Sequence, residues 1–205
     1  NTKKNLWIYS LAVLAVLFVI GVGAYTRIAD AGLGCAVWPG CYGSFIPPEK
    51  AQAAARSYSI QSFDKAKAWI EMFHRYLAGG LGLVLIGLAY QQIHKRQNQF
   101  LAGTIIALVL IQANLGRLTV TMKLQPWIVT FHLLGGFLLL FLTMTLSCRQ
   151  SYALKLRLTS PPVFRIPLFI LTLLYLIQVF LGAWVSSNYA GLACQHFPGC
   201  STEGF

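Results

Sequence analysis

The sequence predicts an all-α polytopic membrane protein: a four-helix transmembrane bundle followed by the fifth helix of a pseudo-symmetric second half. Composition, five long apolar spans and an internal repeat predict this class. Of the 205 residues, 57% are hydrophobic and only 10% are charged, and the mean hydropathy is +0.63. A soluble domain of this length could not bury so much apolar surface, so the chain belongs in a bilayer.

Each of the five apolar spans can cross a hydrocarbon core of about 30 Å at a helical rise of about 1.5 Å per residue. The spans lack the strict alternation of strands, and a helix satisfies its own backbone groups in lipid. The first span is too long for a cleaved signal peptide. We expect transmembrane helices over Leu6–Arg27, Lys67–Ile93, Phe100–Met122, Pro126–Cys148 and Phe164–Ser187.

An internal repeat divides the chain into two units. Residues 22–41, VGAYTRIADAGLGCAVWPGC, return at 181–200 as LGAWVSSNYAGLACQHFPGC, with 9 of 20 positions identical at an offset of 159 residues. A repeat of this length indicates a duplicated structural unit, and a second full unit would extend to about residue 320. We therefore expect an N-terminal four-helix half at 1–159, and at 160–205 the first helix and cysteine loop of a C-terminal half.

The positive charges predict the orientation in the membrane, because Lys and Arg concentrate in cytoplasmic loops. One side carries Lys3, Lys4, Lys95, Arg96, Arg149, Lys155, Arg157 and Arg165. We expect the N-terminus in the cytoplasm and the cysteine loops on the outer, periplasmic side of a bacterial cytoplasmic membrane. The net charge of +11 then reflects topology and attraction to lipid headgroups, and the pattern does not favour nucleic acid as a partner.

Four cysteines form two pairs in the expected outer loops. Cys35 with Cys41, and Cys194 with Cys200, are each spaced C-x5-C, with Pro-Gly before the second cysteine. This turn folds the chain back so that the sulfurs can meet, and disulfides persist outside the cytoplasm. We interpret the pairs as structural disulfides, with redox-active pairs as the alternative. The spacing does not favour zinc, and we expect Cys148 to be a reduced, packed thiol.

Ionisable residues inside apolar spans are costly and indicate function. Glu71 is the one acid within a span, and His74 follows it one turn later on the same helix face. His74 lies about 10 Å from the outer end of its span, and His132 lies about 9 Å from the outer end of another. Two histidines at matched depth on separate helices favour axial ligation of one haem iron.

Small and basic residues surround the two histidines in the sequence. Ala78 and Gly135–Gly136 lie about one turn from a histidine, where a flat macrocycle needs room, although small residues also serve helix packing. Arg27, Arg75 and Arg117 gather near the outer level. We expect their guanidinium groups to contact haem propionates, with snorkelling toward headgroups as the alternative.

Several motifs together resemble the heme A synthase family. They are GAYTRIADAGLGCAVWPGC, EMFHR, LIQANLGRLTV followed by WIVTFHLLGG, and LGAWVSSNYAGLACQHFPGC, and they cover essentially the whole chain. The resemblance implies an intact protein of eight transmembrane helices, in two pseudo-symmetric halves with a histidine pair each. It also implies an enzyme, an oxidoreductase that converts the C8 methyl group of heme O to the formyl group of heme A for terminal cytochrome oxidases.

The resemblance also assigns roles to residues. It implies that His74 and His132 ligate the haem iron in a substrate site for heme O, and that Glu71 is the catalytic glutamate. Cofactor heme b would occupy the C-terminal half, where the repeat places matching histidines at about positions 233 and 291. Partners would be heme O, membrane lipid, and possible contacts with heme O synthase and cytochrome oxidase assembly factors. A buried carboxylate can accept the protons that methyl oxidation releases.

Two other function classes fit part of the pattern. A membrane haem-binding electron-transfer protein or haem carrier would explain the histidines but leave Glu71 without a role. A membrane thiol-disulfide oxidoreductase would use the outer cysteine pairs but leave Glu71, His74 and His132 unexplained. Haem spectra separate the second class from the others, and product analysis separates the first class from the enzyme.

Overall fold

The described part of the chain in the computed structural model is helical, and covers residues 2–35, 37–47, 63–150, 162–191 and 193. Five helices are long and apolar enough to cross a membrane, which confirms the predicted class of all-α polytopic membrane protein. They are α1 (Thr2–Ile28), α3 (Lys65–His94), α4 (Gln99–Thr121), α5 (Pro126–Gln150) and α6 (Pro162–Ser187).

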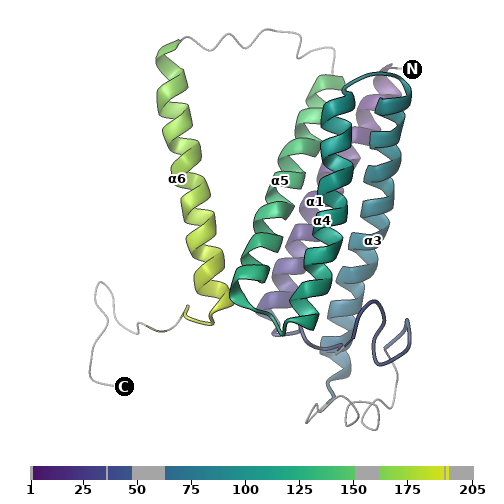
Figure 1. The fold of residues 1–205 in the computed structure, drawn as a ribbon, viewed down its shortest axis with the longest axis vertical. Coiled ribbons are helices and arrows are strands. Elements are labelled where there is room, and N and C mark those ends of the chain that lie inside the picture. Colours follow the sequence, from purple (N-terminus) through teal and green to yellow (C-terminus); the bar gives the residue numbers. More distant parts are fainter. Residues whose placement is uncertain (1, 36, 48–62, 151–161, 192, 194–205) are drawn as a thin grey trace.

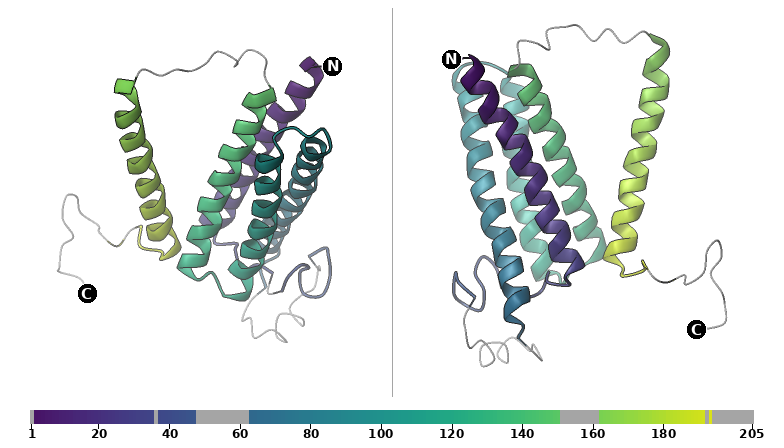
Figure 2. Two further views of the ribbon diagram at one scale, coloured as in Figure 1. Left: turned by 45° about the horizontal axis from the view of Figure 1, so that its top comes forward. Right: turned by 180° about the vertical axis from the view of Figure 1, so that it is seen from behind.

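Four of the helices form a closed ring. Helix α1 packs on α3, α3 on α4, α4 on α5, and α5 back on α1, so that α3 and α5 lie on one diagonal and α1 and α4 on the other. Helix α6 packs on α5. The two helices are close at the C-terminal end of α6 and move apart toward its start (Figure 1). The same separation of α6 from the bundle is visible in both further views (Figure 2).

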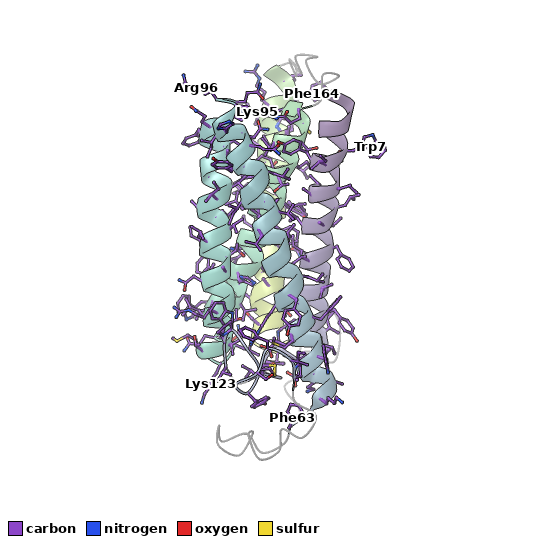
Figure 3. All side chains as sticks on the ribbon, turned by 90° about the vertical axis from the view of Figure 1, so that its right-hand side faces the viewer. Trp7, Phe63, Lys95, Arg96, Lys123 and Phe164 are labelled. Carbon is purple, nitrogen blue, oxygen red and sulfur yellow. A yellow bond between two sulfur atoms is a disulfide. The ribbon has the colours of Figure 1, made fainter. Side chains whose placement is uncertain are left out.

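The two ends of the bundle differ in their loops. The N-terminal end carries the start of α1 and the turn with Lys95 and Arg96, whereas the loop end carries residues 29–47 and Lys123 (Figure 3). Helix α3 projects beyond its neighbours at the loop end (Figure 1). Its start at Lys65, two residues earlier than expected, follows from Asp64, whose side chain accepts backbone hydrogen bonds at 2.8 and 3.1 Å.

The apolar core fills only the N-terminal half of the bundle. Its buried residues come from all four ring helices: Tyr9, Ala12, Val16, Leu85, Leu88, Ala89, Leu101, Ala102, Ile105, Leu108, Val109, Leu139 and Leu146. Buried Gln92 closes this end, because its amide donates to Tyr9 Oη and accepts from Gln150 Nε2 at 2.9 Å. This half therefore contains the larger of the two buried clusters of the bundle.

A second, smaller cluster closes the loop end. Cys35, Cys41, Tyr42, Ala68 and Met72 are buried together where residues 29–35 and 37–47 fold against the first turns of α3. The loop approaches α3 at Gly34, where a Cβ atom would lie 2.6 Å from the carbonyl carbon of Lys67. Only glycine permits this approach of two backbones.

The sequence repeat is a repeat of local structure. Asp30 and Tyr189, which correspond at the offset of 159, both have positive φ angles of 49° and 56°. In each unit the backbone N–H of this residue donates to the carbonyl three residues earlier, and the N–H of the next residue donates to the carbonyl five residues earlier. This is the hydrogen-bond pattern of a Schellman motif. The helix ends of α1 and α6 are therefore built in the same way.

Corresponding residues of the two units also contact each other. Arg27 donates to the carbonyl of Ser186 and lies 3.7 Å over the Tyr189 ring, while Tyr189 Oη donates to Asp30 at 2.9 Å. Both hydrogen bonds join positions 159 residues apart. Lys67 also forms an ion pair with Asp30 at 3.0 Å. The hydrogen bond from Lys67, and to a smaller extent that from Tyr189, holds the pKa of Asp30 below its usual value.

Candidate functional site

The middle of the bundle, between the core and the loop-end cluster, is loosely packed. Within the described helices, no side chain is fully buried over residues 17–25, 73–84, 110–119 or 131–138. Each of these segments comes from a different ring helix, so the looseness spans the whole cross-section. Protein interiors normally pack at crystal-like density, so an under-packed level indicates room for a bound group.

The two predicted histidines enter this level from opposite helices. His74 lies on α3 and His132 on α5, the two ends of one diagonal. Their Nδ1 atoms are buried and have no hydrogen-bond partner. Each ring lies beside a glycine of the other diagonal, His74 beside Gly23 and His132 beside Gly116. The structure thus brings together the pair that the sequence placed at matched depth.

Glycines on the other diagonal make space for these rings. A Cβ atom on Gly23 of α1 would lie 2.9 Å from His74 Cε1 and 3.3 Å from its Nε2. On α4, a Cβ atom on Gly116 would lie 3.5 Å from His132 Cε1. Sequence reasoning missed both positions as site residues, although Gly23 stands in the repeat and Gly116 in the motif LIQANLGRLTV.

The small residues singled out from the sequence occupy other places. Ala78 is exposed on the surface of α3. Gly135 lies under the side-chain amide of Gln112, which a Cβ atom there would overlap, and Gly136 faces Ile20 of α1. The expected room at the two glycines is thus filled by side chains, because helix rotation within the ring directs them toward neighbouring helices. Ala78 instead points away from the bundle.

Gln112 is a further residue that sequence reasoning missed. Its Nε2 atom is buried within the loosely packed level and has no hydrogen-bond partner. The available signal was a polar amide inside an apolar span, but the sequence argument weighed only ionisable groups. Buried polar groups are normally paired, so an orphaned amide calls for an explanation.

Glu71 lies one turn nearer the loop end than His74 and is only 4% exposed. One carboxylate oxygen accepts the backbone N–H of Cys35 at 2.8 Å, and the other pairs with Arg75. The carboxylate therefore joins the cysteine loop to the helix turn that carries His74. This placement links the loop end to the histidine pair.

The three arginines differ in what they contact. Arg75 donates to the carbonyls of Val37 and Gly40 at 2.8 and 2.9 Å, so its guanidinium fork clamps the cysteine loop. Arg27 is engaged with the turn after α6, as described above. Arg117 is exposed and contacts Asn114 on its own helix at 3.0 Å.

The structure joins Cys35 to Cys41 in a disulfide with a Cα–Cα distance of 4.8 Å. Both residues are fully buried beneath the loop. The expected pair Cys194 and Cys200 lies outside the described residues. Cys148 is a free, half-buried cysteine near the N-terminal end of the bundle.

The donor set fits a haem. Among the described residues, no three His, Cys, Asp or Glu side chains converge as a metal site would require. Two imidazoles on diagonally opposed helices suit an iron whose remaining ligands come from a macrocycle. The orphaned Nδ1 atoms, the flanking glycines and the loose packing at the same level are consistent with such a group.

Fold and site together define an integral membrane protein of the helical-bundle class, with a candidate haem site under a disulfide-bonded loop. The family model described as cytochrome oxidase assembly protein matches residues 5–204. The chain therefore belongs to the cytochrome oxidase assembly protein family.

Curated relatives carry the name heme A synthase. The relative from Shewanella oneidensis is 41% identical over 199 residues, which cover 95% of this chain and 60% of that protein. The relative from Bacillus licheniformis is 27% identical over 202 residues, covering 94% of this chain and 62% of that protein. The chain thus spans about three fifths of the length of these relatives. No solved structure matches the chain.

Proposed function

We propose that the protein to which this chain belongs is a heme A synthase. It would oxidise the C8 methyl group of heme O to a formyl group, and residues 1–159 would form its substrate half, with 160–205 opening a second half for heme b. The similarity to relatives named heme A synthase supports the reaction. The observation that carries the site is the histidine pair on diagonal helices, with buried Nδ1 atoms that have no partner, in a loosely packed level.

His74 and His132 would hold the iron of heme O, with the glycines on α1 and α4 leaving space beside the imidazoles. The packed core blocks the N-terminal end, so the charged propionates would face the loop end. Of the three arginines, Arg117 hydrogen-bonds a side chain of its own helix and does not hold a loop. We therefore assign the propionate contact to Arg117. Arg27 and Arg75 would instead hold the loops that cover the site.

Glu71 is placed to serve the methyl group that reacts. In heme O the C8 methyl shares a pyrrole ring with a propionate, so it belongs to the edge nearer the loop end. Glu71 lies at that side of His74. Conversion of a methyl to a formyl group with oxygen from water releases electrons and protons. When bound, the haem would supply a path for these electrons to an external electron acceptor, and the Glu71 carboxylate would accept protons at its oxygens.

The membrane setting completes the proposal. Eight Lys and Arg residues flank the start of the chain and the short connections expected at the N-terminal end of the bundle. Their clustering supports a cytoplasmic position for that end and a periplasmic position for the loop end. A disulfide is stable on that side. Because the Cys35–Cys41 pair is buried, it supports the loop better than it supports thiol exchange. Heme O synthase and oxidase assembly factors would be the upstream and downstream partners.

Haem content and product together test this function. Intact protein should bind haem and form heme A, whereas His74→Ala and His132→Ala should lose haem from this half and lose product. The matched control is His94→Ala, because His94 ends α3 far from the site. A protein that binds haem but makes no heme A would instead be a carrier or an electron-transfer protein. Retention of full haem content and product in both variants would remove the pair from the site.

A further inference from the structure

The orphaned amide of Gln112 has no part in the function proposed above. Its Nε2 atom is buried without a partner and is the atom of the amide that lies nearest to Gly135 of α5. Gln112 therefore spans the interface between α4 and α5 inside the bundle. An unpaired buried amide is costly, so a ligand that pairs with it would gain both affinity and discrimination.

The position of Gln112 relative to the histidines follows from helix register. Gln112 lies four residues before Gly116, which faces the His132 ring, and Gly135 lies three residues after His132. Helices α4 and α5 run in opposite directions, so both steps lead away from the loop end, by about 5 Å. The buried core begins just beyond, at Val109 and Leu139. Gln112 is thus the polar group at the inner limit of the site.

That depth corresponds to one edge of the substrate. With the propionates at the loop end, the opposite edge of the porphyrin faces Gln112. On that edge heme O carries a hydroxyethylfarnesyl group, whose hydroxyl lies on the carbon attached to the ring. Heme b carries a vinyl group there instead. A hydroxyl both donates and accepts, so it can pair with an amide in either orientation of the Gln112 side chain.

We propose that Gln112 hydrogen-bonds the hydroxyl of the hydroxyethylfarnesyl group and thereby selects heme O over heme b in this half of the protein. The proposal rests on the function argued above. A vinyl group would leave the Nε2 atom of Gln112 without a hydrogen-bond partner. Sites built to hydrogen-bond a substrate hydroxyl discriminate strongly against analogues that lack it.

The test measures which haem the intact protein carries. Protein would be purified from cells that make both heme b and heme O, and the extracted haems would be separated by chromatography. Gln112→Met keeps the length of the side chain and removes its hydrogen bonds. We expect the ratio of heme O plus heme A to heme b to fall about 5- to 100-fold at this site, with total haem unchanged. Gln112→Glu retains an acceptor and should keep most of the preference.

The control is Gln91→Met, because Gln91 is an exposed glutamine of α3 near the N-terminal end of the bundle. Its haem composition should match that of the unmodified protein. A Gln112→Met protein with an unchanged haem ratio would overturn the proposal. So would equal loss of both haems, or a shifted haem spectrum without a changed ratio, because Gln112 would then position His132. Absence of any haem bound to His74 in the unmodified protein would overturn the proposed function itself.

Discussion

At the scale of single residues, the site depends on glycines, which lack a Cβ atom, as well as on the polar side chains. Gly23 leaves the space that the His74 ring occupies, and the buried Nδ1 atom of each imidazole has no hydrogen-bond partner. Glu71 and Arg75 connect this level to the cysteine loop through hydrogen bonds to its backbone. Small changes here should alter binding and chemistry separately.

Gly23→Ala should weaken haem binding. The new Cβ would lie 2.9 Å from His74 Cε1, so the ring must shift away from the position from which it would ligate iron. Gly21→Ala is the matched control, two residues away on α1, where a Cβ meets nothing within 4 Å. Haem content and the visible spectrum of the purified variants measure the effect. Equal haem content in both variants would show that His74 does not need this space.

Glu71→Gln should separate chemistry from binding. Gln keeps the size of the side chain and one acceptor oxygen for the Cys35 N–H, but it cannot act as a carboxylate base. We expect haem to be retained, with some loss of stability because Arg75 loses its charge partner, and heme A formation to fall at least about 100-fold. Asp30→Asn, an exposed acid at the same end, is the control. Near-normal heme A formation by Glu71→Gln would leave Glu71 a structural anchor of the loop.

At the scale of elements, the cysteine loop is held by backbone contacts as well as by the disulfide. Gly34→Ala should destabilise the protein by about 1–3 kcal/mol, because its Cβ would overlap the backbone of α3 at Lys67. Gly103→Ala on α4, where a Cβ meets nothing, should be neutral or stabilising by about 0.5–1 kcal/mol. Thermal unfolding in detergent compares the two variants. The loop contact would be dispensable if Gly34→Ala melted at the same temperature as the unmodified protein.

At the scale of the whole molecule, contacts between residues 159 apart are what a pseudo-twofold axis produces. The same operation can be applied to the α5–α6 contact, where Thr130 Oγ1 lies 3.4 Å from Ser187 Oγ. It moves Ser187 onto Ile28 and Thr130 to about position 289 of an intact protein. Ile28 is 83% exposed at the end of α1, so a partner helix can cover it.

Cysteines at position 28 and at about position 289 of the intact protein should therefore form a disulfide on mild oxidation. A cysteine replacing Leu14, which is exposed on the same helix about 20 Å further along its axis, should not cross-link to that position. Gel mobility with and without reductant reads the result. Failure of the Ile28→Cys pair to form, or equal reaction of the Leu14→Cys pair, would contradict the twofold arrangement. The same period places matching histidines at about positions 233 and 291.

The sequence by itself determined the elements and the residue types of the site. Hydropathy and helical length are properties of the local chain, so each of the five spans matches an observed helix. Four spans lie wholly within their helices, and the span Phe100–Met122 passes the end of α4 by one residue. Asp64 caps α3 and begins it two residues earlier than expected. The repeat at 159 residues predicted the matching turns after α1 and α6. Glu71, His74 and His132 stood out because polar groups in apolar spans are costly.

Only the tertiary structure decided how these residues meet. Which helices lie on a diagonal, and so which side chains share the interior, depends on packing between segments far apart in sequence. The depth of Arg75 along its span predicted a contact with a propionate. In the folded protein Arg75 instead donates to carbonyls of the cysteine loop. Gly23, Gly116 and Gln112 became site residues for the same reason. Helix rotation in the ring sets their directions, and no periodicity along one helix encodes its rotation relative to another.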